Sequence, residues 1–296
     1  KLVRTLVREG VADVVSLPLD PEELLQTAVA ILEVEATASQ PADLAPMVVT
    51  ARSLGGTGAT TLVTNLARAL SRQPGCTRGV CILDLDVQFG AVADMLGLAP
   101  RRTLADLLDA EGRVDGAFLR TVSATHESGI CVIAAPQDIV PLEAIDAHKL
   151  QSILTIARRE FDYVLLDMPS NWTTWSLSLM LEADSILMLV EQSLPSLRQA
   201  RRRLELFKSV GVDMRLVSVV ANRLEKRLFG SISLSDIAQT LDQEVLCGLR
   251  LEGQTIADAQ AQGLLVDQLK PKSNYVADIN RLAEIVASRL AAGNRS

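Results

Sequence analysis

The chain has 296 residues, of which 48% are hydrophobic and 22% charged, a composition typical of globular proteins rather than disordered or fibrous ones. Its net charge of −7 argues against a protein whose whole surface follows nucleic-acid phosphates. No apolar run approaches the ~20 residues that a membrane-spanning helix needs, and no signal peptide is visible. With four cysteines and no CxxC pair, we expect a cytoplasmic protein with reduced thiols.

The first 34 residues predict a helix, a strand and a second helix. Gly10 ends the first helix, as glycine often does, and the apolar run 11–17 predicts a short strand. Asp20 is placed as the N-cap of the second helix, with Pro21 at its first position.

This segment, residues 1–34, resembles the last βα step of a response-regulator receiver domain. Such domains carry a Lys-Pro pair at the strand end, whereas Leu17-Pro18 stands here. The alternative is an αβα extension of the main domain. Because the chain begins inside a helix at Lys1, without a methionine, we expect a fragment of a longer protein. The small and polar residues 35–45 predict a linker.

From residue 46 onward, short apolar runs alternate with helical patterns. The predicted strands are Met47–Ala51, Val80–Asp84, Ile130–Ile133, Tyr163–Asp167, Ser185–Val190, Leu216–Ala221 and Val245–Leu249. The predicted helices are Thr60–Ser71, Thr103–Leu108, Leu150–Glu160, Trp175–Leu181, Leu197–Ser209 and Leu234–Leu241. Continuous apolar strands alternating with helices indicate a doubly wound, mainly parallel α/β domain over residues 46–290, followed by a tail at 291–296.

A glycine-rich loop joins the first of these strands to a helix, which is the context that a phosphate loop requires. Glycines at this point let backbone N–H groups curl around a phosphate, and the helix N-terminus adds partial positive charge. The Thr60 hydroxyl is placed to reach Mg²⁺, and Thr61 to reach the α-phosphate. The alternative is a glycine-rich turn that binds nothing. The candidate nucleotide-binding residues of the loop are Gly55, Gly56, Thr57, Gly58, Ala59, Thr60 and Thr61.

Polar residues end three further strands. Asp84 and Asp86 follow a buried strand at the carboxyl edge where open sheets bind ligands. Asp167 ends another strand in a Walker B pattern and would hold a water on Mg²⁺, so Thr60, Asp84 and Asp167 are the candidate metal residues. The amide of Asn222 both donates and accepts, which suits an adenine edge. The alternative is that these residues only cap turns and helices.

Together these segments resemble the MinD/ParA family, whose deviant phosphate loop reads Lys-Gly-Gly-x-Gly-Lys-Thr-Thr. Leu54 and Ala59 replace both lysines. The resemblance implies that the first lysine would reach the partner's nucleotide and the second the β- and γ-phosphates. One lost charge-assisted contact lowers affinity by about 10- to 150-fold, and a lost transition-state donor lowers the rate by about 10²–10³. Arg52 is a candidate substitute for the missing charge.

Within that superfamily, Gln88-Phe-Gly90, Ala134-Ala-Pro136 and 271–275 resemble the pilus-assembly ATPases called CpaE or TadZ. This resemblance implies a homodimer that binds ATP and Mg²⁺ and recruits other pilus-assembly proteins, at a pole or peripherally at the membrane. Asp86 would lie near the attacking water, as the catalytic candidate, and Asn222 with Arg223 would lie by the base.

Two other functions stay open: a nucleotide-independent scaffold, suggested by Leu54 and Ala59, and a ParA-like DNA-partition ATPase. The basic helix that would serve the latter carries Arg198, Arg201, Arg202, Arg203 and Lys208. With a net charge of −7 we favour a solvated or protein-binding face for it, and nucleic acid is not an expected partner. We expect the last helix to pack on the domain rather than bind a membrane.

Overall fold

The computed structural model describes residues 44–110, 114–225 and 232–293. The chain divides into two compact units, Lys1–Leu44 and Ala45–Ser296. The receiver-like interpretation of residues 1–34 lies outside the described residues, as does most of the predicted linker. The second unit contains all the candidate site residues.

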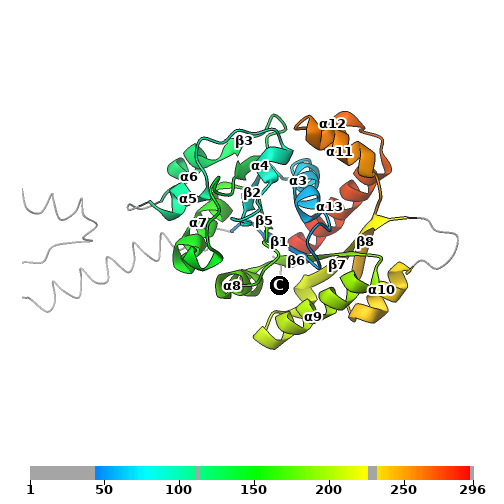
Figure 1. Cartoon of the computed structure of the whole chain (residues 1–296). Coiled ribbons are helices and arrows are strands. Elements are labelled where there is room, and N and C mark those ends of the chain that lie inside the picture. The colour runs from blue at the N-terminus through cyan, green and yellow to red at the C-terminus, as the bar shows by residue number, and fades with distance from the viewer. Residues whose placement is uncertain (1–43, 111–113, 226–231, 294–296) are drawn as a thin grey trace, which may run out of the picture. The chain divides into compact units, whose positions relative to one another are not determined.

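One eight-stranded sheet organises the second unit, in the order β3-β4-β2-β5-β1-β6-β7-β8 (Figure 1). All neighbouring strands pair in parallel except β3 with β4, which are antiparallel. The bounds are β1 Met47–Arg52, β2 Val80–Asp84, β3 Ala124–Thr125, β4 Cys131–Ile133, β5 Tyr163–Asp167, β6 Ser185–Glu191, β7 Val217–Leu224 and β8 Val245–Arg250. The predicted doubly wound, mainly parallel α/β fold is therefore confirmed.

Helices cover both faces of the sheet, with α3 and α13 on one side and α7, α8 and α9 on the other (Figure 1). Their bounds are α3 Ala59–Leu70, α4 Val92–Met95, α5 Leu104–Leu108, α6 Gly116–Val122, α7 Ala147–Glu160, α8 Thr174–Glu182, α9 Leu194–Val210, α10 Leu234–Leu241, α11 Gly253–Ala261, α12 Val266–Leu269 and α13 Asn274–Gly293.

Each central strand is buried on both faces because successive side chains point to opposite sides of the sheet. On β1, Val48 packs into the core beneath α3 and α13, whereas Met47 and Val49 pack into the core beneath α7 and α8. This two-sided burial is why the strands read as continuous apolar runs rather than alternating ones. Burial of this kind contributes about 25 cal/mol per Å² of apolar surface removed from water.

Several short elements were not predicted. Strand β3 has only two residues and α4 only four, so neither leaves a readable period. Helix α11 begins with Gly253 and buries only Ala259, so it has no apolar stripe to detect. By contrast, α13 packs Val276, Ile279 and Leu282 into the same core as α3, as expected for a helix that packs on the domain. Within the described residues, no helix combines the length and apolar character that crossing a bilayer requires.

Candidate nucleotide-binding site

The glycine loop lies at the carboxyl end of β1, the strand between β5 and β6, and leads into α3. Gly56 and Gly58 have φ values of 77° and 88°, a left-handed conformation that glycine adopts without steric cost. The start of the loop is fixed by Ser53, whose N–H donates to the Leu189 carbonyl at 2.9 Å. Its hydroxyl also lies 2.8 Å from the Ser196 hydroxyl of α9.

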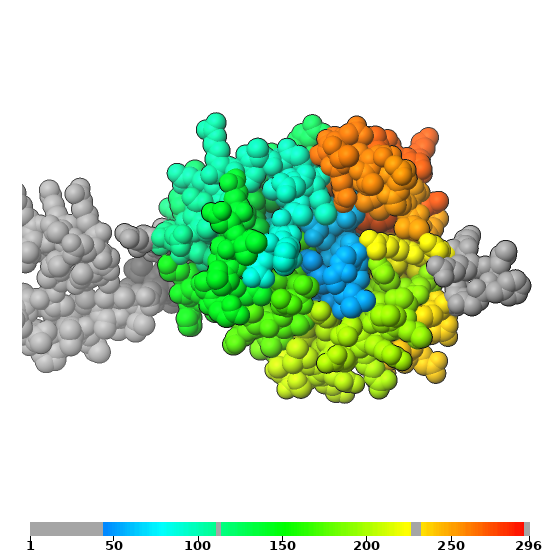
Figure 2. Space-filling view, in the orientation of Figure 1, coloured from blue at the N-terminus to red at the C-terminus, as the bar shows by residue number. Residues whose placement is uncertain are grey.

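The backbone N–H groups of residues 54–61 donate no hydrogen bond to any described residue. In a folded protein such a run of unpaired donors is unusual unless water or a ligand satisfies them. Gly55 and Gly56 are exposed, and a Cβ placed on either would meet nothing within 4 Å. Figure 2 shows the blue segment that contains the loop on the molecular surface. The loop therefore presents free donors and open space, which fit a phosphate chain.

Asn222, at the end of β7, braces this loop. Its Nδ2 donates to the carbonyl oxygen of Thr57 at 2.7 Å, and its Oδ1 accepts the N–H of Arg223 at 2.9 Å. A Cβ on Gly58 would lie 2.8 Å from the same Nδ2. The side chain thus fixes the loop from behind, and contact with an adenine edge stays a prediction.

The three predicted carboxylates meet at neighbouring strand ends. Asp84 of β2 is the register partner of Asp167 of β5, and both side chains are buried together with that of Asp86. The Thr60 hydroxyl, in the first turn of α3, donates to Oδ2 of Asp167 at 2.6 Å. The structure therefore brings the phosphate loop and all three carboxylates to one edge of the sheet.

Asp84 is engaged by backbone on both oxygens. Its Oδ1 accepts the N–H of Asp86 at 3.2 Å and its Oδ2 that of Val92 at 3.0 Å. Burial raises the pKa of Asp84 to about 8, and the charge of Asp167 adds to the increase. Glycine is required at position 90, because a Cβ there would overlap Ala135 and the Asp84 carboxylate. Asp84 thus holds the loop after β2, and its role toward a metal stays a prediction.

Arg52 supplies the positive charge among these carboxylates. Its Nη2 lies 2.9 Å from Oδ1 of Asp167, and its Nη1 lies 3.4 Å from Oδ2 of Asp86. Only 12% of the Arg52 side chain is exposed. Burial raises the pKa of Asp167, while Arg52 and the Thr60 hydroxyl lower it. Arg52, which the sequence suggested as a substitute for the missing lysine charge, therefore lies beside Asp86 and Asp167.

The oxygen donors suit Mg²⁺, which binds few protein carboxylates and completes its shell with water and substrate phosphates. Among the residues with defined positions, no three His, Cys, Asp or Glu side chains form a metal-holding group by themselves. The Thr60 hydroxyl and the Asp167 carboxylate fit an ion that arrives with a nucleotide.

Arg223 and Thr61 each contact a residue that the sequence did not suggest. Arg223 has a φ of 56°, and its Nη1 pairs with Oε1 of Glu191 at 2.7 Å. The Thr61 hydroxyl accepts a hydrogen bond from Nε2 of Gln260 at 2.9 Å. Gln260 belongs to α11, and no sequence motif marks it.

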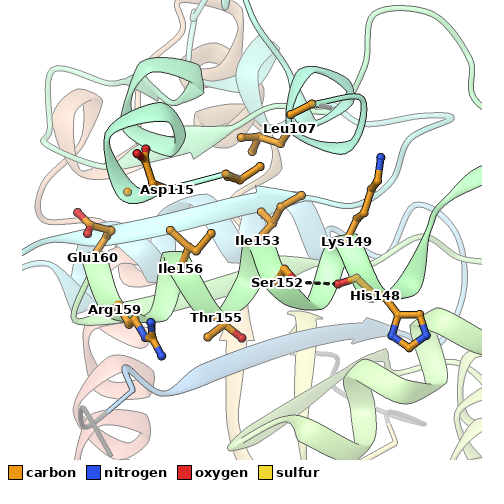
Figure 3. Close-up of a pocket in the computed structure, with 13 residues that line it drawn as sticks. Leu107, Asp115, His148, Lys149, Ser152, Ile153, Thr155, Ile156, Arg159 and Glu160 are labelled. Carbon is orange, nitrogen blue, oxygen red and sulfur yellow. Dashed lines mark hydrogen bonds between the residues drawn. The ribbon is translucent and has the colours of Figure 1, made fainter. Parts of the chain in front are cut away.

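A separate pocket of about 760 Å³ lies between α7 and the segment of α5 and α6 (Figure 3). It contains no residue of the phosphate loop. Three of its charged side chains already have partners, since Asp115 caps α6, Lys149 donates to the Leu108 carbonyl and Glu160 pairs with Arg120. We assign it no chemistry.

Comparison with known proteins agrees with this geometry. The ParA family model, described as NUBPL iron-transfer P-loop NTPase, matches residues 44–287. The septum site-determining protein MinD of Thermotoga maritima is 23% identical over 205 residues, which cover 68% of this chain and 73% of that protein. The fold is similar to that of a ParA family ATPase from Chlorobium tepidum, with a TM-score of 0.74 and 22% identity over 81% of this chain and 98% of the other.

A second solved structure is that of the septum site-determining protein MinD of Pyrococcus horikoshii complexed with Mg-ADP. Its TM-score is 0.69, with 20% identity over 82% of this chain and 96% of the other. At this level of identity the likeness concerns the fold.

Proposed function

The chain belongs to the ParA family of P-loop NTPases, and from this premise we propose that it binds ATP with Mg²⁺ and acts as a nucleotide-dependent switch. The observation that supports this most directly is the run of unpaired N–H groups at residues 54–61 beside Thr60 and Asp167. The MinD protein of Pyrococcus horikoshii, solved in complex with Mg-ADP, has a similar fold.

Each candidate residue except Asp84, whose oxygens accept backbone N–H groups, has a role in this proposal. The N–H groups of residues 54–61 bind the phosphates, and the Thr60 hydroxyl with Asp167 holds Mg²⁺, which would neutralise phosphate charge. Asp86 orients the attacking water, and Asn222 with Arg223 lies near the base. Because Asn222 donates a hydrogen bond to the Thr57 carbonyl, binding of the base near Asn222 would also affect the conformation of the loop.

Hydrolysis is expected to be weak or absent. Leu54 and Ala59 stand where the family has lysines, and no residue from Ser53 to Thr61 carries a positive charge. The lost donors lower the rate by about 10²–10³ each, whereas binding can survive on the backbone donors. We therefore propose a switch that depends on nucleotide occupancy more than on turnover.

We further propose that the nucleotide-bound form is a homodimer that recruits pilus-assembly proteins of the Tad/Flp type at a pole or at the membrane surface. The sequence resemblance to CpaE/TadZ proteins supports this part. We do not propose iron transfer for this chain, because its four cysteines include no CxxC pair.

Calorimetric titration with ATP and Mg²⁺, with phosphate release followed in the same sample, tests the proposal. Binding with little turnover is the expected result. No binding at millimolar ATP would overturn it and favour the second candidate, a scaffold that acts without nucleotide, which Leu54 and Ala59 support. Salt-sensitive binding of duplex DNA would instead support a partition ATPase.

A further inference from the structure

Arg203 of α9 is a half-buried cation that has no anionic partner among the residues the structure describes. Its Cζ lies 5.4 Å from the centre of the Trp172 ring, so the guanidinium covers the indole. It makes no ion pair or hydrogen bond with a described residue, and its Nη1 is buried without an acceptor. The sequence predicts a solvated or protein-binding face for this helix, but Arg203 packs on the Trp172 ring, whereas its neighbour Arg202 is exposed.

Buried polar groups without partners are rare because each loses its hydration without compensation. Nε1 of Trp172, the residue that Arg203 covers, and Nε of Arg52 are also buried and unpaired within the described chain. All three atoms are donors. What this cluster of donors (Arg52, Trp172 and Arg203) lacks is an acceptor with several oxygens.

Arg52 connects these donors to the phosphate loop. Arg52 directly precedes Ser53, and it bonds Asp167, which also accepts from Thr60. Ser196, seven residues before Arg203 on the same helix, contacts Ser53. Arg203 is close enough to Arg52 for their charges to repel, and burial followed by this repulsion lowers the pKa of Arg203.

We propose that Arg203, together with Arg52, binds the terminal phosphoryl group of the nucleoside triphosphate and replaces the positive charge of the missing loop lysines. This inference rests on the proposed function and names the residues that distinguish a triphosphate from a diphosphate. When the triphosphate binds, Nη1 of Arg52 donates to the phosphate instead of to Asp86. Nη1 of Arg203 donates to the same phosphate.

A phosphoryl group fits the donor cluster better than a carboxylate does. Arg52 is already paired with Asp86 and Asp167, so the charge without a counter-ion among the described residues is that of Arg203. A terminal phosphate brings three acceptor oxygens, enough to accept from Arg203 and from Arg52 at once. A carboxylate offers only two oxygens to the same donors. Guanidinium groups also offer planar, paired donors that suit phosphate oxygens.

The test compares affinities of the full chain for ADP and for a non-hydrolysable ATP analogue, both with Mg²⁺, by calorimetry. Arg203→Gln is expected to weaken analogue binding by about 10- to 150-fold, the range for one charge-assisted contact, and to change ADP binding by less than about threefold. Arg202→Gln, which removes an exposed arginine from the same helix, is the matched control and should leave both affinities unchanged. Arg203→Lys keeps the charge and should fall between.

Trp172 provides a second readout. In a Trp175→Phe background it is the only tryptophan, and its emission should shift with the analogue more than with ADP as Arg203 leaves the ring. Inorganic phosphate is titrated in parallel, with Mg²⁺, in the absence and in the presence of ADP. If phosphate alone shifts the Trp172 emission and ADP does not increase that shift, the donor cluster is a site for free anions. That result would overturn the assignment.

If wild type binds nucleotide but Arg203→Gln has the same ratio of analogue affinity to ADP affinity as wild type, the inference fails and the proposed function stands. An equal loss of both affinities has the same meaning. The inference also fails if Arg203→Gln weakens self-association at an unchanged ratio, which would make Arg203 a contact to a second copy. If wild type binds neither nucleotide, the proposed function falls and this inference with it. Thermal unfolding of Arg203→Gln checks the fold, and only a small loss of stability is expected, because the removed charge has no counter-ion but its contact with the Trp172 ring is lost.

Discussion

The Nδ2 atom of Asn222 donates to the carbonyl oxygen of Thr57 at 2.7 Å, so the end of β7 holds the phosphate loop that follows β1. These residues lie 165 positions apart in the chain. The bond satisfies a buried carbonyl without using any of the loop N–H groups, which leaves those groups free for a ligand.

Asn222→Ala should therefore destabilise the protein and weaken nucleotide binding. Loss of a buried hydrogen bond that leaves the Thr57 carbonyl unpaired costs about 1–3 kcal/mol. Chemical denaturation measures the stability, and an ATP titration measures the affinity. Asn280→Ala, at an exposed position on α13, is the control. Equal stability of both variants would mean that Asn222 does not brace the loop.

Gly58→Ala and Gly55→Ala should differ in stability although both change a loop glycine. Gly58 has φ +88°, and a new Cβ would lie 2.8 Å from Nδ2 of Asn222, so the substitution should cost more than about 1 kcal/mol. At Gly55 a new Cβ meets nothing within 4 Å, and we expect a change within about 0.5 kcal/mol. Thermal or urea unfolding measures both, and similar losses would contradict the described loop conformation.

Ala59→Lys should raise ATP affinity by about 10- to 150-fold, because an added cation at the first position of α3 can reach the phosphates. Ala59 is only 3% exposed, so without nucleotide the variant should be less stable than wild type. Ala59→Met adds comparable length without charge and separates the two effects. An unchanged affinity with lysine would argue against phosphate binding at this loop.

The stability of the protein should fall as pH rises from about 4 to about 8, in part through Asp84. The pKa of this carboxyl is raised from 3.8 to about 8 by burial, so over this range the folded protein keeps a proton that the unfolded chain releases. Its contribution to stability is full below pH 3.8 and is lost as pH approaches 8.

Urea denaturation at pH 5.5 and pH 8 measures this slope, and Asp84→Asn should reduce it even if the variant is less stable at both values. Asp213→Asn is the control. The pKa of Asp213 is lowered to about 2 by the Arg215 side chain and backbone, so its contribution changes only in acid. An equal slope in Asp84→Asn and wild type would show that Asp84 is ionised in the folded protein.

Much of the fold could be predicted because the sheet is buried on both faces. Strands such as β2 and β5 begin and end where the apolar runs predicted. Helix α9 starts three residues before the predicted Leu197, since Ser193 caps it and Pro195 lies in its first turn. Elements of two to four residues, such as β3 and α12, were missed because their ends are fixed by tertiary packing.

The sequence by itself determined the phosphate loop, the carboxylates at the strand ends and the order of strands and helices, because these follow from local periodicity and glycine spacing. It also predicts that Leu54 and Ala59 stand at the positions of the two lysines in the family pattern.

Only the tertiary structure decided which distant groups meet. Arg52 pairs with Asp86 and Asp167. Arg203 packs over the Trp172 ring. Asn222 donates a hydrogen bond to the Thr57 carbonyl. Helical periodicity fixes which residues share a face, but the neighbour of that face depends on how helix and sheet pack. The charges at this site are therefore set by contacts between segments far apart in the chain.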